Sequence, residues 1–182
     1  MDKNPATFEN LEIIKDSLNS GSSNLLFYEN AFSKINLIQE IISAQKLPIL
    51  YIDLDFLFSG FMHSELLTFE NLSLFNTLES NLNQILPEIL NKISLEPHLV
   101  IIDSVNGLYN TLSNNEDSGR AVNAILMLIS QNIKSSDSIL IIPALATKKN
   151  EKWILPNGRQ ILENENVKKI SLSDRSKISI QK

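Results

Sequence analysis

Short, continuous apolar runs alternate along the chain with longer segments of a different periodicity. Four such runs lie at residues 25–29, 49–56, 99–102 and 138–143. Continuous apolar runs bounded by polar, turn-forming residues are typical of buried β-strands. The pattern therefore predicts four buried strands.

The segments between these runs have helical spacing. In residues 31–45 apolar side chains recur every three or four positions, which predicts an amphipathic helix. The leucines at 74, 78 and 82 predict a second helix that begins near Ser73, with a kink or break at Pro87, after an irregular segment at 56–72. A third is predicted at 121–133, with an inward face consisting of Ile125, Leu128, Ile129 and Ile133.

The last part of the chain has a different pattern. An Asn-Gly pair at 157–158 lies between two apolar stretches, which predicts a hairpin turn. Residues 167–172 and 177–181 are predicted to be further strands and to form an antiparallel edge. Strands alternating with helices predict an α/β fold, with a mainly parallel sheet covered by helices on both faces.

Composition narrows the class of protein. The 182 residues are 43% hydrophobic, which suits one domain over 1–182, with 1–10 as a candidate disordered segment. There is no cysteine, so disulfides and thiolate metal sites are excluded. We find no apolar run long enough to span a membrane and no secretory signal pattern, so we expect a cytoplasmic protein.

The net charge of -5 argues against a globally basic nucleic-acid binder. A local basic patch remains at Lys148, Lys149 and Lys152, beside Trp153. A tryptophan among lysines can stack on a base, but we favour a solvated loop with the indole packed into the core. His63 and His98 have no neighbouring cysteine, and we expect surface or packing roles for them.

Carboxylates end two of the predicted strands. Asp53 and Asp55 lie at the far end of the second strand and Asp103 ends the third. In a parallel α/β sheet this edge carries function. For Asp55 and Asp103 we favour helix capping or hydrogen bonds to loop backbone, with a catalytic or metal-binding role as the alternative. We assign no metal site.

Several motifs resemble the RecA/RadA recombinase and KaiC superfamily. LVIIDSVNGLYN, at 99–110, resembles the aspartate-serine stretch that closes the third strand in RadA-type recombinases. Ser118-Gly119-Arg120 resembles their Ser-Gly-Arg before a helix, and Pro156-Asn157-Gly158 resembles their C-terminal proline-glycine element. The resemblance covers residue 8 to the end and implies a RecA-like fold. It places Asp103 at the magnesium-linked aspartate and Asp55 at the catalytic glutamate.

The phosphate-binding loop of that superfamily is degenerate in this sequence. A working loop reads G-x-x-x-x-G-K-[ST], because glycines let backbone amides approach the phosphates. The corresponding residues 28–35 read YENAFSKI, so Lys34 alone remains. We therefore disfavour ATP and Mg²⁺ as cofactors. We expect Lys34 to be a solvated residue in the first helical turn, with a vestigial phosphate contact as the alternative.

Three functions follow from these observations. The first is a non-catalytic RecA/RadA-like module that assembles with itself or with a RecA-like protein and supports DNA recombination or repair. The second is a ring subunit similar to the Elongator accessory subunits, which binds tRNA. The third is a divergent ATPase that uses Lys34, Asp55 and Asp103.

Overall fold

A seven-stranded sheet forms the centre of the computed structural model, which describes residues 14, 17–77, 81–113, 117–150, 152–161, 167–173 and 178–181. The strand order is β3-β2-β4-β5-β1-β8-β9, and only β9 is antiparallel to its neighbour. The predicted α/β class with a mainly parallel sheet and an antiparallel C-terminal edge is confirmed. The strands are β1 (Ser23–Tyr28), β2 (Ile49–Asp53), β3 (Leu72–Asn76), β4 (Leu99–Asp103), β5 (Ile139–Leu145), β8 (Val167–Leu172) and β9 (Ile178–Gln181).

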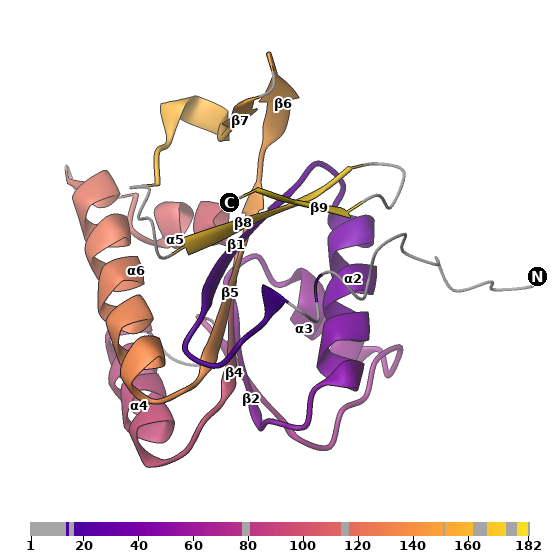
Figure 1. Cartoon of the computed structure of the whole chain (residues 1–182), viewed down its shortest axis with the longest axis vertical. Helices are drawn as coiled ribbons and strands as arrows, with labels where there is room; N and C mark the ends of the chain where they lie inside the picture. Colours follow the sequence, from indigo (N-terminus) through magenta and orange to yellow (C-terminus); the bar gives the residue numbers. More distant parts are fainter. Residues whose placement is uncertain are drawn as a thin grey trace, which may run out of the picture.

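Helices cover both faces of the sheet (Figure 1). One face carries α2 (Ala31–Ala44) and α3 (Leu57–His63). The other carries α4 (Leu82–Leu95), α5 (Val105–Thr111) and α6 (Ser118–Ser135). None of the helices in the described part of the chain is long and apolar enough to cross a membrane.

The continuous apolar runs reflect burial on both sides of each strand. In β1, Leu25 and Phe27 pack toward α4 and α6, while Leu26 and Tyr28 pack toward α2. A strand covered on both faces gains from apolar residues at every position rather than at alternate ones. This explains why the four predicted strands are found where the runs lie.

Two helix predictions are wrong in part. The segment at 72–76 is β3, which pairs in parallel with β2, and the helix begins only at Leu82. It then runs unbroken through Pro87. Leu78, which suggested the earlier start, lies outside the described residues.

The segment predicted to be irregular contains α3. In α6, Leu128 is 48% exposed and does not face inward.

The C-terminal turn also differs from the prediction. Asn157 and Gly158 have the positive φ angles of a hairpin turn, 60° and 66°, but they belong to a short 3-10 helix, Pro156–Gly158. The hairpin lies earlier, between β6 (Thr147–Lys149) and β7 (Lys152–Ile154). β8 is parallel to β1, so the antiparallel edge consists of β8 with β9. The candidate disordered segment at 1–10 lies outside the described residues.

Gly107 allows α5 to pack closely against the end of β2. A β-carbon at this position would lie 2.6 Å from Cβ of Leu54 and 3.0 Å from its carbonyl carbon and oxygen. We therefore expect Gly107→Ala to lower the free energy of unfolding by about 1 to 3 kcal/mol through overpacking. Urea denaturation measures the change.

Gly60 in α3 provides the matched control. No atom lies within 4 Å of a β-carbon there, so Gly60→Ala should be neutral or stabilise by up to about 1 kcal/mol through helix propensity. Equal effects of the two substitutions would contradict the close approach at Gly107.

Candidate functional site

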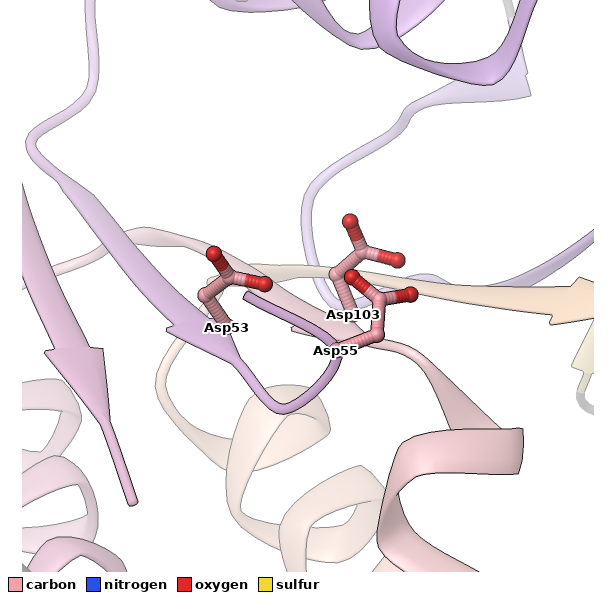
Figure 2. Close-up of side chains that lie close together, drawn as sticks. All are labelled: Asp53, Asp55 and Asp103. Atoms are coloured by element: carbon pink, nitrogen blue, oxygen red, sulfur yellow. The ribbon is translucent and has the colours of Figure 1, made fainter. Parts of the chain in front are cut away.

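Three aspartates gather at the carboxyl edge of the sheet (Figure 2). β2 and β4 are adjacent and parallel, and their register places Asp53 beside Asp103. Tyr51 and Ile101, two residues before Asp53 and Asp103, face α2, so the two aspartate side chains lie on that same face of the sheet. Asp55 lies two residues beyond Asp53, and carboxylate oxygens of all three lie within 4.8 Å of one another. The predicted functional edge therefore brings Asp55 and Asp103 together.

Lys34 lies inside this site, and the prediction of a solvated side chain is wrong. It is fully buried, and its Nζ lies 2.8 Å and 2.6 Å from the two carboxylate oxygens of Asp103. The same nitrogen is 3.6 Å from Oδ2 of Asp55. A buried lysine requires such partners, because an unpaired charge in the interior is costly. Lys34 and Asp103 thus join the first turn of α2 to the end of β4.

Two tyrosines complete the surroundings of this ion pair. The Tyr51 hydroxyl donates to Oδ2 of Asp103 at 2.5 Å, and the Lys34 ammonium lies 5.3 Å from the centre of the Tyr28 ring. Tyr51 is fixed by its stacking on Phe58 at 3.9 Å. Burial raises the pKa of Tyr28 to about 12 and that of Tyr51 well above its usual value, so both hydroxyls stay protonated.

The ion pair is charged at neutral pH. Burial lowers the pKa of Lys34, but Asp103, Tyr28 and Asp55 together outweigh this effect, and the net shift is upward. Burial raises the pKa of Asp103 to about 6, even though the Lys34 ammonium opposes the rise. With the pKa of Lys34 raised and that of Asp103 at about 6, both side chains are ionised at pH 7.

Asp53 lacks a cationic partner of this kind. It is fully buried, and its Oδ2 accepts a hydrogen bond from the backbone amide of Ser59 in the first turn of α3, at 2.6 Å. Its Oδ1 is buried without any hydrogen-bond partner. Burial raises the pKa of Asp53, and the Ser59 amide opposes the rise. One buried carboxylate oxygen is therefore unsatisfied, which is rare in folded proteins.

Asp55 is the most accessible of the three carboxylates, with 31% of its side chain exposed. Its Oδ1 lies 3.4 Å from the backbone amide of Leu57, the first residue of α3. This contact agrees with the expected hydrogen bond to local backbone. Asp103 does not cap a helix, since the Ser104 hydroxyl caps α5 by accepting from the Gly107 amide.

The connection between β1 and α2 consists of Glu29 and Asn30 alone. Asn30 is the N-cap, and its side chain accepts hydrogen bonds from the amides of Phe32 and Ser33 at 2.9 Å and 3.1 Å. In a phosphate loop these amides would face the phosphates. The residues present therefore do not fit a triphosphate in that position, because the amides and the lysine already have partners within the chain.

The other candidate residues lie away from this cluster. Lys148, Lys149 and Lys152 are exposed on the β6–β7 hairpin, which projects beyond the sheet in Figure 1. Trp153 stacks on Phe27 at 5.6 Å, so its indole packs against the core rather than lying open to a base.

The two histidines make local backbone contacts. Nδ1 of His63 lies 2.7 Å from the Ser59 carbonyl oxygen, and Nδ1 of His98 lies 2.8 Å from that of Glu96. His98 is buried at the start of β4, and His63 is exposed at the end of α3. These positions agree with the expected packing and surface roles.

Tyr51 was not expected at the site from the sequence, and Asp53 was placed at the functional edge without a role of its own. Both lie in β2, and their alternation with Leu50 and Ile52 puts them on the α2 face. A strand periodicity of two, applied to β2 and β4 together, would have placed Tyr51, Asp53 and Asp103 on one face. The burial of Lys34 had no such signal, because its partner lies 69 residues away in the sequence.

No protein-family model and no curated protein matches this sequence. Among solved structures, the fold is similar to the RadB recombinase, with a TM-score of 0.57 and 13% identity over 86% of this chain and 80% of that one. It is also similar to a KaiC-like protein from the hyperthermophilic archaeon Pyrococcus horikoshii OT3, with a TM-score of 0.52 and 14% identity over 86% and 76% of the two chains. The chain therefore has the RecA-like fold.

The unsatisfied oxygen of Asp53 predicts a pH-dependent effect of its replacement. Because the folded-state pKa is raised, the ionised carboxyl destabilises the fold above that pKa, and the penalty vanishes below the unfolded value of 3.8. In chelator-treated buffer, Asp53→Asn should stabilise the protein by about 1 to 3 kcal/mol near neutral pH. The gain should shrink steadily toward about pH 4.

Urea denaturation at several pH values tests this expectation. Asp117→Asn is the control, since Asp117 is an exposed carboxylate, 3.6 Å from Arg120 at the start of α6. A loss of stability in Asp53→Asn at neutral pH would show that the ionised carboxyl is satisfied in the folded protein.

Proposed function

We propose that this chain is a non-catalytic RecA-like module that acts by protein-protein assembly in support of DNA recombination or repair. The observation that carries the proposal is the ion pair of Lys34 with Asp103. In the phosphate loop of nucleotide-binding relatives the lysine reaches the β- and γ-phosphates. Here the equivalent lysine neutralises a carboxylate of its own chain.

Nucleotide binding in the usual position would break several of these contacts. The Lys34 ammonium would have to leave Asp103, which would then be a buried carboxylate without its cation. The amides of Phe32 and Ser33 would have to leave the Asn30 side chain. A triphosphate would also face the carboxylates of Asp55 and Asp103 with little positive charge to offset them. These costs support a module without ATPase activity.

Aromatic side chains support the assembly part of the proposal. Phe32 is 65% exposed on the first turn of α2, and its ring meets Phe61 edge to face at 6.5 Å. Phe56 is 37% exposed and has a φ of 62°, a strained value for a bulky residue. Exposed aromatic residues are enriched at the centre of protein interfaces, and backbone strain is often retained at functional sites.

The β6–β7 hairpin supports a nucleic-acid contact within that role. Lys148, Lys149 and Lys152 are exposed on a short antiparallel pair. Clustered lysines contact phosphates without reading sequence, so any such binding should weaken with added salt. This surface would position the module on a nucleic acid.

A second candidate is a divergent ATPase, and one observation favours it. The fold brings together Lys34, Asp55 and Asp103, the residues that such an enzyme would use. An ATPase would require the lysine to exchange Asp103 for phosphate. Titration with ATP and Mg²⁺ distinguishes the two functions.

We expect no heat of ATP binding in calorimetry and no phosphate release when millimolar ATP is added to the protein in the presence of Mg²⁺. The reason is that Lys34 and the amides of Phe32 and Ser33 already have partners. Asp55→Asn is the diagnostic variant. If the wild type hydrolyses ATP and Asp55→Asn binds it without hydrolysis, the divergent ATPase is the correct reading.

We expect the protein to self-associate, and Phe32→Glu to weaken that association at least tenfold, a typical loss for a central aromatic contact. The stability of the fold should change by less than about 0.5 kcal/mol, since the side chain is exposed. Sedimentation velocity over a range of concentrations measures the self-association of the wild type and of Phe32→Glu.

Leu95→Glu is the matched control, because Leu95 is 76% exposed but ends α4 just before β4 begins, at the opposite edge of the sheet. A monomer at every concentration, with no affinity for a RecA-like protein or for DNA, would exclude the proposal. A hexamer that prefers tRNA to DNA would select the Elongator-like alternative.

A further inference from the structure

The chain contains two Asn-Gly pairs, at 106–107 and at 157–158, and neither belongs to the cluster around Lys34. In this dipeptide the asparagine side chain can react with the backbone nitrogen that follows it, because glycine has no β-carbon to hinder the approach. Asparagine is a chemically labile residue for this reason. The two pairs have the same local chemistry, so the difference between their surroundings decides which of them reacts.

The first pair is held in an unreactive arrangement in α5. Oδ1 of Asn106 accepts from the Leu145 amide at 2.8 Å, and its Nδ2 donates to the Leu145 carbonyl oxygen at 3.3 Å. The Gly107 nitrogen donates to the Ser104 hydroxyl at 3.2 Å. Attack on the Asn106 amide would break these contacts in a place where Leu54 already packs closely against Gly107. The reaction there must wait for local opening, and its rate falls with the population of the open form.

The second pair is in the opposite situation. Asn157 and Gly158 are exposed in the short 3-10 helix Pro156–Gly158, with φ angles of 60° and 66°. Among the described residues beyond its chain neighbours, no heavy atom lies within 4 Å of a β-carbon built at Gly158. Rotation of this backbone meets no obstacle from the rest of the fold. The Gly158 nitrogen can therefore reach the side-chain carbonyl carbon of Asn157 without unfolding of the domain.

We propose that Asn157 is a site of spontaneous deamidation and that Asn106 is not. The Gly158 nitrogen forms a bond to Cγ of Asn157 and loses its proton, while the bond from Cγ to Nδ2 breaks and ammonia leaves. Water then opens the resulting cyclic imide at one of its two carbonyl carbons. Opening at Cγ gives aspartate at position 157, and opening at the backbone carbonyl gives isoaspartate. The net reaction is the hydrolysis of one amide, so it needs no oxidant, reductant or cofactor.

The reaction changes the segment after β7 where that segment contacts α5. The Arg159 guanidinium donates to Oδ1 of Asn110 at 2.6 Å and to the carbonyl oxygen of Asn106 at 3.3 Å, and it lies 5.2 Å from the centre of the Tyr109 ring. Either product adds a carboxylate two residues before Arg159, and isoaspartate also lengthens the main chain by a methylene group. This modification does not depend on the assembly role proposed above, so either proposal can fail without the other.

Incubation of the folded protein in mildly alkaline buffer made with heavy-oxygen water tests the proposal. Peptide mapping by mass spectrometry locates the oxygen taken up when the ring opens, and methylation by an isoaspartyl methyltransferase measures isoaspartate. We expect the peptide that contains Asn157 to take up label at least about ten times faster than the peptide that contains Asn106. The reason is that Asn106 and Gly107 must first lose their three hydrogen bonds. Asn157→Gln should remove most of the isoaspartate, since glutamine closes a larger ring that forms more slowly.

The same protein denatured in guanidinium chloride is the matched control. Both pairs lose their surroundings there and should react at similar rates, and incubation of the two samples continues until both pairs have reacted in the denaturant. The proposal is overturned if Asn157 stays unmodified in the folded protein over this time. It is also overturned if the folded protein modifies Asn106 as fast as Asn157, because the surroundings of the two pairs would then have no effect.

Discussion

The ion pair between Lys34 and Asp103 is the constraint on which the carboxyl edge of the sheet depends. It ties the first turn of α2 to the last residue of β4. Two buried charges gain little net stability from their attraction, but removing either one leaves the other unpaired in the interior. The pair is therefore a strong restraint on geometry, and Tyr51 and Asp55 are arranged around it.

The arrangement of this edge follows from a short-range feature of the chain. Asn30 caps α2 only two residues after β1 ends, so no loop remains between strand and helix. An asparagine cap satisfies amides that a glycine-rich loop would leave open for a ligand. Lys34 then falls in the first turn of a regular helix and reaches inward to the nearest carboxylate. One capping residue thus satisfies the amides of Phe32 and Ser33 and sets where α2, and with it Lys34, begins.

Much of the fold and the position of the acidic edge could be predicted from local patterns, but the contacts within the site could not. Periodicity predicts β1, β2, β4, β5 and α2, because the apolar residues of a strand covered on both faces and of an amphipathic helix have distinct spacings. β3 was mistaken for a helix because leucines at 74, 78 and 82 fit a helical period, while its pairing with β2 is a tertiary contact. The burial of Lys34 and the unsatisfied oxygen of Asp53 depend on residues distant in sequence, so propensity and spacing carry no signal for either.

The parallel sheet explains why the carboxylates meet at this edge. Parallel pairing of β2 with β4 places Asp53 beside Asp103 whether or not a nucleotide is bound, because the register depends on backbone hydrogen bonds and on the apolar residues of both faces. Among the described residues, the cation in contact with these carboxylates is Lys34 of the same chain. The likeness of fold to the RadB recombinase and the KaiC-like protein concerns the backbone alone, and the side chains at this edge decide what it can bind.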